Sequence, residues 1–313
     1  MTQERDLQLP DRPPVIDYED SGYKTDFWVG QGREYEDTVE RLALARLMPP
    51  RGLRIAEIGA GFGRLADQYV GYEQIVLFDY SRTLLVDAAR HWGHDSRFVF
   101  VAGNVYDLPL ADGVLDTLVM VRVMHHLADV PAALAQLRRA LHGRSVAVIE
   151  YANKRNLKAM LRWMTRRQAW SPLDPQPVEF VELNFDFHPD WMSDQLAASG
   201  LSGIEQYGVS HFRLPLVKNR VGPDTLARLD ASIFGIGGKY PLAPSVFVQL
   251  QAPYAGQRSD ASTASDAVAG LFRCPVAGTA SFEQVDEDLI RSADSGLAYA
   301  RRNGVWDFKE PVR

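Results

Sequence analysis

The sequence predicts an α/β fold built on a mostly parallel sheet, and three observations support this prediction. Short apolar runs alternate with segments of helical period over the first half of the chain. Several of these runs end in an acidic or polar residue. A glycine-rich turn follows the first of them, at residues 59–63. Strands that alternate with helices form parallel sheets covered on both faces, which gives three layers.

The first strand ends close to an acid, Glu57, and three glycines alternate after it at Gly59, Gly61 and Gly63. Glycine lets the backbone turn sharply and approach a ligand closely. The helical pattern that follows would offer free N–H groups to polar or anionic ligand groups. Such turns also occur for structural reasons alone. Because Arg64 replaces the third glycine of a dinucleotide fingerprint, the residues predict another nucleotide-type ligand.

The next strands also end in polar residues. Residues 74–79 end at Asp79, whose carboxylate can accept hydrogen bonds from two ribose hydroxyls. Residues 97–104 run into Asn104, and a further strand at 117–121 leads to Arg122. A helix is expected at 133–141 and a fifth strand at 146–149. Strands six and seven are expected at 203–209 and 245–251.

Taken together, these motifs resemble the class I S-adenosylmethionine-dependent methyltransferases of the type-11 kind. The resemblance spans about residues 36–152 and includes the stretch 107–127 in the family's order. It implies a three-layer Rossmann-like fold with a seven-stranded, mostly parallel sheet whose last strand is antiparallel. It also implies the cofactor S-adenosyl-L-methionine, held by Glu57, Gly59, Gly61, Gly63, Asp79, Tyr80, Asn104, Val105 and Arg122.

Methyl transfer from a sulfonium proceeds by in-line displacement, so the protein mainly binds and aligns the reactants. A base is needed only when the acceptor must lose a proton. His125 and His126 follow the fourth strand, where the acceptor should approach, and one of them could serve. We expect instead that His126 caps the next helix or packs beneath the cofactor. No catalytic residue is therefore assigned.

The chain divides into four parts. Residues 1–35 are expected to form an arm, which in many methyltransferases folds over the cofactor as a lid. Arg33 or Tyr35 could then meet the methionine carboxylate, or the arm's aromatic residues could simply pack on the sheet. Residues 36–252 form the methyltransferase domain, with an insertion at about 153–244 that should shape the acceptor pocket.

Within that insertion, residues 154–167 hold six basic residues and no acid, and predict a basic amphipathic helix. Such a helix can dock on membrane or RNA phosphates. Because acidic residues follow it in the sequence, we favour a helix packed against the domain with a solvated basic side.

Residues 253–270 have the composition of a linker, and residues 271–313 resemble a degenerate Trm112-like zinc ribbon. Of four ligand positions only Cys274 keeps a cysteine, and Ala277, Ser292 and Ser295 occupy the others. Tetrahedral zinc needs four nitrogen or sulfur ligands, so zinc binding should be lost and no metal is expected. The ribbon should persist through its apolar residues, packed on the larger domain.

Composition restricts the function further. The chain of 313 residues is 46% hydrophobic and carries a net charge of −6, which argues against general attraction to nucleic acid or anionic membrane. One cysteine suits a reducing compartment, and no apolar run approaches the roughly 18 residues of a membrane span. A cytoplasmic location and no stable membrane association are expected.

Three functions remain open at this point. The first is a methyltransferase acting on oxygen, nitrogen or carbon of a small molecule. The second is a tRNA or rRNA methyltransferase, suggested by the basic helix and by the proteins with which Trm112-like domains associate. The third is a catalytically silent protein that keeps the fold as a scaffold. The sequence does not identify the acceptor or the oligomeric state.

Overall fold

The protein is described here from a computed structural model, which covers residues 12–22, 26, 28, 30–218, 220–253, 256–259 and 265–312. The parts of the expected arm and linker at 1–11, 23–25, 27, 29, 254–255 and 260–264 lie outside these residues.

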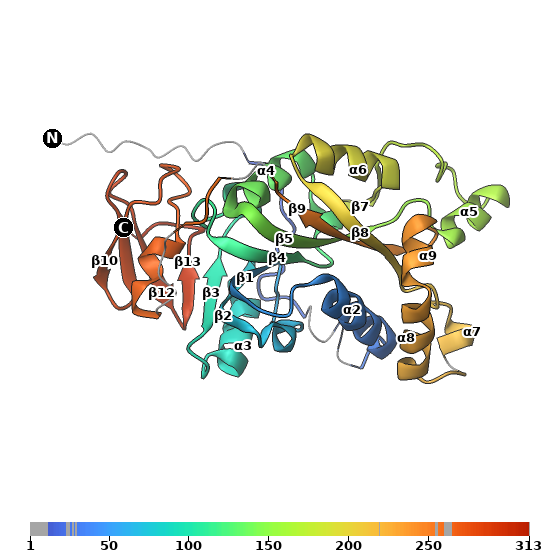
Figure 1. The fold of residues 1–313 in the computed structure, drawn as a ribbon, viewed down its shortest axis with the longest axis horizontal. Coiled ribbons are helices and arrows are strands. Elements are labelled where there is room, and N and C mark those ends of the chain that lie inside the picture. Colours follow the sequence, from blue (N-terminus) through green and yellow to red (C-terminus); the bar gives the residue numbers. More distant parts are fainter. Residues whose placement is uncertain are drawn as a thin grey trace.

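One sheet runs through the molecule (Figure 1), and seven of its strands form the expected methyltransferase sheet. In spatial order these strands are β3 (Phe98–Ala102), β2 (Tyr72–Asp79), β1 (Gly52–Ile58), β4 (Leu115–Met120), β5 (Leu141–Ala152), β9 (Ser245–Gln251) and β8 (Ser202–Val209). The first five are mutually parallel, and β9 is antiparallel to both of its neighbours. The predicted mostly parallel sheet with an antiparallel last strand is confirmed.

Helices cover both faces of this sheet. One face carries α2 (Glu34–Leu47), α3 (Arg82–Trp92), α8 (Pro223–Ser232) and α9 (Phe234–Lys239), and the other carries α4 (Val130–Ala140) and α6 (Pro189–Ala198). Two separate apolar clusters follow from this arrangement. Leu134 and Leu196 belong to the first, and Leu44 and Leu85 to the second. Because side chains alternate across a strand, β1 contributes to both clusters, which gives the three layers.

Shorter elements complete this part of the chain. They are the 3-10 turns η1 (Ala66–Tyr69), η2 (Val105–Asp107) and η3 (Met124–His126), the helices α5 (Leu157–Met164) and α7 (Pro215–Lys218), and the hairpin β6 (Val178–Val181) and β7 (Asn184–Asp186). Helix α6 begins after His188, whose Nδ1 accepts the Asp190 N–H at 3.3 Å.

Helix α5 lies at the far end of the molecule from the tail (Figure 1). Its apolar side is not packed as the sequence analysis favoured, because Leu157, Leu161 and Met164 are 54–69% exposed. Only Ala159 of this helix is buried. The preference for a packed helix is therefore wrong for its apolar side. Among the residues that the structure covers, no helix has both the length and the apolarity to cross a membrane.

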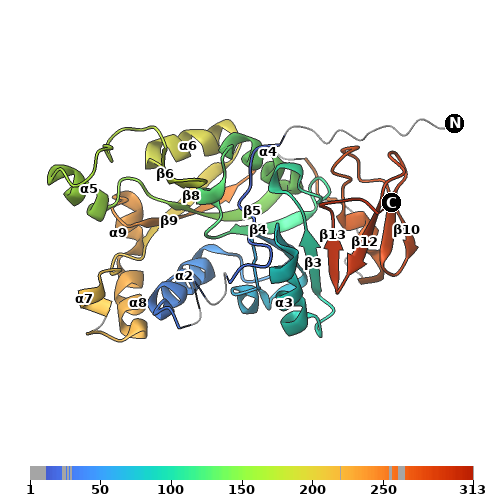
Figure 2. The same cartoon turned by 180° about the vertical axis from the view of Figure 1, so that it is seen from behind.

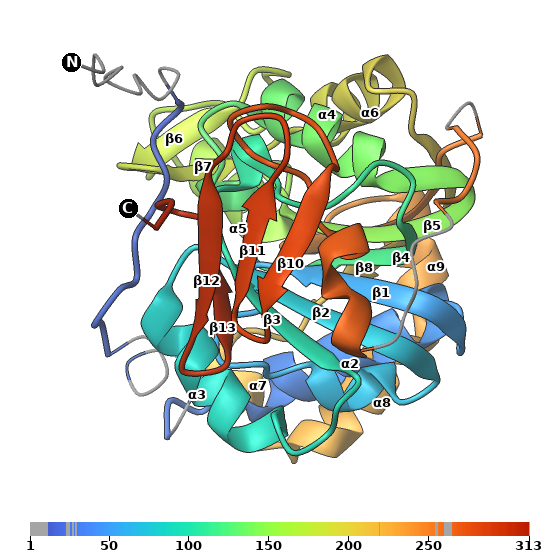
Figure 3. The same ribbon diagram turned by 90° about the vertical axis from the view of Figure 1, so that its left-hand side faces the viewer.

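The tail extends the same sheet. After η4 (Ser265–Leu271) come β10 (Phe282–Asp286), β11 (Leu289–Ser292), β12 (Ala298–Arg302) and β13 (Val305–Asp307), and β13 pairs in parallel with β3 (Figure 3). In this register Trp306 lies opposite Val101. Trp306 and Phe308 are buried and contact the ring of Phe272. This aromatic core continues the core on the α4 side of the sheet.

Candidate functional site

The glycine turn after β1 has the backbone that its glycines suggest. Gly59, Gly61 and Gly63 have φ values of +76°, +54° and +76°, a region that residues with a Cβ rarely adopt. The N–H groups of Gly59 and Ala60 donate to the Phe78 carbonyl at 2.8 and 2.9 Å. A Cβ on Gly59 would collide with Val123, which follows β4. The turn is thus fixed between the ends of β2 and β4.

The helix expected after this turn is much shorter than the pattern suggested. Only the four-residue 3-10 turn η1 follows, so the prediction of a regular helix here is wrong. The reason is the early start of β2 at Tyr72, nine residues after Gly63. In addition, a Cβ on Gly71 would overlap the Pro50 carbonyl, so the chain has to turn back at that glycine.

Glu57 lies near the end of β1 and is 3% exposed. Burial raises the pKa of Glu57 to about 8, while the Arg64 guanidinium and the nearby Tyr69 hydroxyl act in the opposite direction. Asp79 contributes a smaller rise. Glu57 is therefore a carboxyl group that stays largely protonated near neutral pH, and it can donate as well as accept a hydrogen bond.

This pKa predicts a pH dependence of stability. Between about pH 4.5 and 8 the folded state keeps a proton on Glu57 that the unfolded chain has lost, so stability falls as pH rises through this window. Glu57→Gln removes that proton exchange. We expect the free energy of unfolding of Glu57→Gln minus that of the wild type, both measured in urea, to rise by about 1–3 kcal/mol from pH 5 to pH 8. Parallel pH profiles of the two proteins would contradict the raised pKa.

Asp79, at the end of β2, connects the glycine turn to the next helix. Its carboxylate accepts the Gly61 N–H at 2.7 Å and the Ser81 N–H at 2.9 Å. Burial raises the pKa of Asp79, and these two hydrogen bonds counteract part of the rise. The ends of β1 and β2 are therefore joined by a buried carboxylate at the carboxyl edge of the sheet.

A second group of charges lies past β4. Arg122 has a φ of +60°, and its N–H donates to Glu150 at 2.9 Å. Its guanidinium donates to Glu40 at 2.5 Å, and Arg64 donates to the other oxygen of Glu40 at 2.9 Å. Burial raises the pKa of Glu40, but Arg122 and Arg64 outweigh it and hold that pKa below its usual range. Both arginines also lie over the Trp28 ring, 5.1 and 3.9 Å from its centre.

The arm crosses this edge of the sheet, as residues 12–22 make contacts at three strand ends (Figure 2). Arg12 pairs with Asp107 after β3. Tyr18 lies 3.4 Å from His126 Nε2 after β4. The Glu19 carboxylate accepts the N–H groups of residues 82 and 83 at the start of α3. This segment covers the strand ends where the polar residues gather.

The sequence of residues 56–149 matches the profile of the family described as Methyltransferase domain. These residues form a methyltransferase domain. The family match implies S-adenosyl-L-methionine as the cofactor. A search of curated proteins finds no significant match to the chain.

One solved structure supports the fold of this methyltransferase domain. A chain from the complex of the Haloferax volcanii Trm112 methyltransferase activator with a protein named as a methyltransferase is 17% identical, with a TM-score of 0.50. The match covers 73% of this chain and 97% of that one. An S-adenosylmethionine-dependent methyltransferase from Mesorhizobium loti is 18% identical with a TM-score of 0.49, over 69% of this chain and 99% of its own.

The remaining predicted cofactor residues of the methyltransferase domain lie at the same edge. Asn104 accepts the Tyr106 N–H at 3.0 Å and so caps η2, and Val105 is buried. The Tyr80 ring lies beneath Lys309 of the tail, whose Nζ is 3.9 Å from the ring centre. No sequence pattern indicates this contact, because Lys309 lies 229 positions away from Tyr80. The tail therefore reaches the predicted cofactor site.

His125 and His126, which follow β4, are uncharged near neutral pH. Burial lowers the pKa of His125 well below its ordinary value, helped by His126 and Arg122. Burial also lowers the pKa of His126, whose Nδ1 lies 3.1 Å from the Leu183 carbonyl. The idea that His126 caps α4 is wrong, because Asp129 accepts the Ala132 N–H at 2.9 Å there.

Tyr35, which could have contacted the methionine carboxylate, instead contacts groups within the protein. The Tyr35 hydroxyl donates to Asp230 and accepts the Phe212 N–H at 3.0 Å, so it is used within the protein. Arg33 lies near Trp28, with 5.7 Å from its guanidinium to the ring centre. Trp28 and Tyr35 thus pack against charged groups of the domain.

The four tail positions that the Trm112-like resemblance assigns to zinc ligands come together. The Cys274 Sγ lies 3.4 Å from the Ser295 hydroxyl and accepts the Ala277 N–H at 3.4 Å. The Ser292 hydroxyl oxygen accepts the Ser295 N–H at 3.3 Å. These positions lie on two similar turns. The Gly278 N–H donates to the Cys274 carbonyl and the Gly296 N–H donates to the Ser292 carbonyl, each at 2.8 Å. Within the described ranges, no cluster of three or more His, Cys, Asp or Glu residues could hold a metal ion.

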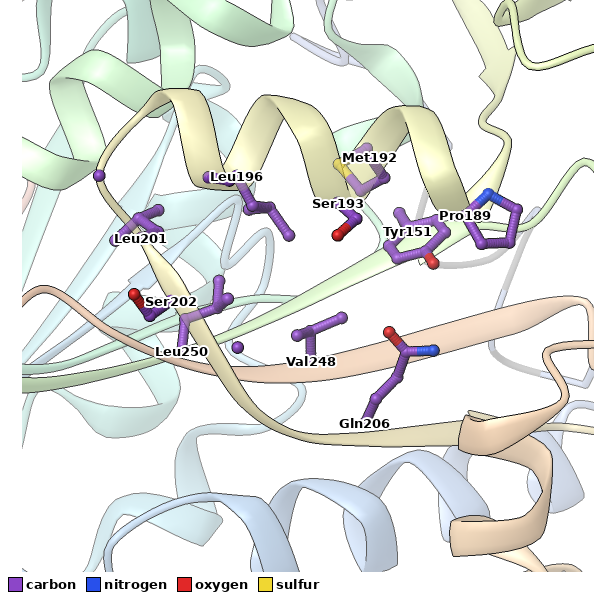
Figure 4. Close-up of a pocket in the computed structure, with 13 residues that line it drawn as sticks. Tyr151, Pro189, Met192, Ser193, Leu196, Leu201, Ser202, Gln206, Val248 and Leu250 are labelled. Atoms are coloured by element: carbon purple, nitrogen blue, oxygen red, sulfur yellow. The ribbon is translucent and has the colours of Figure 1, made fainter.

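A cavity of about 290 Å³ lies between α6 and the strands β8 and β9 (Figure 4). Its walls are formed by apolar and uncharged side chains such as Met192, Leu196 and Gln206. None of the predicted cofactor residues lines it. Without charged groups, this cavity does not supply the polar contacts that a nucleotide-type ligand needs.

Proposed function

We propose that the chain is an S-adenosylmethionine-dependent methyltransferase that acts on a small-molecule acceptor. The observation that carries this proposal is the hydrogen bond from the Gly61 N–H to Asp79. It joins the glycine turn after β1 to the acid after β2, the two features of a nucleotide-type site at the carboxyl edge of a parallel sheet. The methyltransferase-domain match agrees with this placement.

The residues present fit the cofactor. A carboxylate has about four lone-pair positions, and Asp79 uses two of them on backbone N–H groups. The other two suit the two hydroxyls of a ribose. A side chain at position 59 would collide with Val123, so only glycine fits in the turn beside the expected ligand. Tyr80, Asn104 and Val105 follow the next two strands, where an adenine ring would lie.

When bound, the cofactor supplies a methyl group on a positively charged sulfur. The protein then has to align the acceptor and keep water away. The hydrogen bonds of Arg64 and Arg122 to Glu40 connect the segment after the glycine turn to the segment after β4, between the cofactor and the acceptor. Residues 12–22 cover the strand ends and act as the lid, which must move when the cofactor enters. No catalytic base is assigned, because an acceptor that is already deprotonated needs none.

The tail supports the cofactor half of the domain. β13 pairs with β3, and Lys309 lies over Tyr80. A methyltransferase activator named Trm112 belongs to the complex of one similar structure. In this chain the tail takes a comparable supporting role as part of the same polypeptide, with hydrogen bonds around Cys274 in place of a metal.

Loss of the Asp79 carboxylate should weaken cofactor binding. Charged hydrogen bonds of about 1.5–3 kcal/mol are lost in Asp79→Ala, so affinity for S-adenosylmethionine should fall more than about tenfold in calorimetric titration. Asp87→Ala is the matched control, because Asp87 lies on the outer side of α3 with its carboxylate 42% exposed. Equal affinity of Asp79→Ala and wild type would contradict the ribose assignment.

The acceptor class is tested by transfer of a labelled methyl group to metabolite extracts and to RNA from the same cells. Labelled small molecules, absent with Asp79→Ala, are the expected result. Labelled RNA, together with co-purifying RNA that salt removes, would favour the nucleic-acid alternative. Cofactor binding without transfer to either pool would favour the scaffold.

A further inference from the structure

Arg213 lies at the carboxyl edge of the sheet, on the turn after β8. β8 and β5 both pair antiparallel with β9, so they are parallel to each other. The end residues Val209 and Ala152 lie opposite the same residue, Ser245. The turn at 210–213 therefore begins level with the end of β5. In the sheet order, β4 lies between β1 and the strands β5, β9 and β8.

A buried carboxylate holds this turn in place. Asp230 is fully buried and accepts the N–H groups of Ser210 and His211 at 2.8 and 3.1 Å. It also contacts His211 Nδ1 at 2.6 Å, and the Tyr35 hydroxyl donates to it. Ser210 has a φ of +69°, a strained conformation that these bonds maintain. The backbone that presents Arg213 is thus preorganised.

Arg213 itself has no partner among the described residues. Its side chain forms no hydrogen bond and no ion pair within 4.0 Å with another described residue. Its Nε is shielded from solvent. Burial lowers the pKa of Arg213, and the nearby Arg122 adds to this effect. Arg213 is half-buried, and its shielded Nε lacks an acceptor among the described residues, which is costly for a charged group, so the position is one that an anion would stabilise.

Three of the carboxylates near Arg213 are already used by other groups, and a fourth, Asp186, acts on it through space without forming an ion pair within 4.0 Å. Glu40 is bound by two other arginines, and Glu36 is bound by Lys218 at 2.8 Å. Glu150 accepts the backbone N–H of Arg122 and the Ser245 hydroxyl. These acids influence Arg213 through space, but none of them is its partner.

We propose that Arg213 binds a carboxylate of the acceptor, so that the enzyme methylates small molecules carrying a carboxylate group. This inference rests on the proposed function. The planar guanidinium matches a carboxylate in two parallel hydrogen bonds. Two nearby acids, Glu150 and Asp186, oppose a dianion such as phosphate, so a single negative charge fits best.

The acceptor, and not the cofactor, is the ligand at Arg213. The glycine turn and Asp79 follow β1 and β2, whereas Arg213 follows β8 on the other side of β4. Arg122, which follows β4, lies between the two halves and is itself paired with Glu40. An acceptor held by Arg213 therefore approaches from the side opposite to the ribose site.

The test uses acetate as the probe and acetamide as its uncharged counterpart, both with the full chain saturated with S-adenosylhomocysteine. At constant ionic strength, 100 mM acetate should raise the melting temperature of the wild type and acetamide should not. Arg213→Met should lose this shift, and Arg213→Lys should keep only part of it. Arg228→Met, which changes an exposed arginine on α8, should behave as the wild type.

A second readout separates this inference from the proposed function. Arg213→Met should bind S-adenosylhomocysteine within about twofold of the wild type, while transfer to acids among the metabolites falls at least about tenfold. An equal acetate shift in Arg213→Met, or no difference between acetate and acetamide in the wild type, would overturn the inference. The inference would also be overturned if Arg213→Met lost affinity for S-adenosylhomocysteine but not for methylthioadenosine. Methylthioadenosine lacks the methionine carboxylate, so this result would place Arg213 at the cofactor. Failure of the wild type to bind the cofactor would refute the proposed function instead.

Discussion

Gly59→Ala should lower the affinity for S-adenosylmethionine by about a hundredfold. The backbone at this position has a φ of +76°, which costs about 1–2 kcal/mol for a residue with a Cβ. In addition, the new methyl group would lie 3.2 Å from the Val123 Cβ and overlap one of its methyl groups. Moving the turn away from Val123 breaks its bonds to the Phe78 carbonyl. A total of about 3 kcal/mol corresponds to about a hundredfold in affinity.

Two variants give this prediction its controls. Gly59→Ala combined with Val123→Ala removes the overlap but keeps the backbone strain, so it should recover about half of the lost binding energy. Gly222→Ala places a methyl group where nothing lies within 4 Å, and should bind as the wild type. Calorimetric titration of all four proteins measures the effect. Equal affinities of wild type and Gly59→Ala would mean that the turn does not contact the cofactor.

Trp306→Ala should destabilise the whole chain, not the tail alone. Trp306 is 2% exposed, lies opposite Val101 on β3 and contacts Phe272. Removal of a buried tryptophan side chain costs about 3–5 kcal/mol. For a domain of this size, each kcal/mol lowers the melting temperature by about 2–4 °C, so a drop of about 10 °C is expected.

The position of Trp306 also predicts a loss of function. β3 leads to Asn104, and the chain after β13 carries Lys309 over Tyr80. Cofactor affinity of Trp306→Ala should therefore fall together with stability. Val285→Ala, at a 48% exposed position of the same tail, is the control and should leave both unchanged. If Trp306→Ala unfolds in two separate transitions, with the larger one at the wild-type temperature, the tail is an independent unit and the account of it is wrong.

The sheet could be predicted from the sequence because its signals are local. Each strand is a short apolar run, and the ends of β1 and β2 are marked by Glu57 and Asp79. The antiparallel direction of the last strand came from the family resemblance, and the structure has it. The helix after the glycine turn was mispredicted because its length depends on where β2 begins and on the tight turn at Gly71.

The charged groups around the site could not be predicted, since their partners are far apart in the sequence. Glu40 and Arg122 are 82 positions apart, and Tyr35 and Asp230 are 195 apart. No pattern within a helix or strand indicates such pairs. The sequence does not distinguish Arg213 from other basic residues of the insertion, because what sets it apart is the absence of a partner among the residues that the structure covers.

The central claim is that the glycine turn and Asp79 form one binding site for S-adenosylmethionine. Calorimetric titration of the full chain with this cofactor tests it most directly, with NAD and ATP as competing nucleotides. The account predicts one site per chain for S-adenosylmethionine, weakened more than about tenfold in Asp79→Ala, and no binding of the other two. Absence of heat with S-adenosylmethionine, or tighter binding of NAD or ATP, would contradict it.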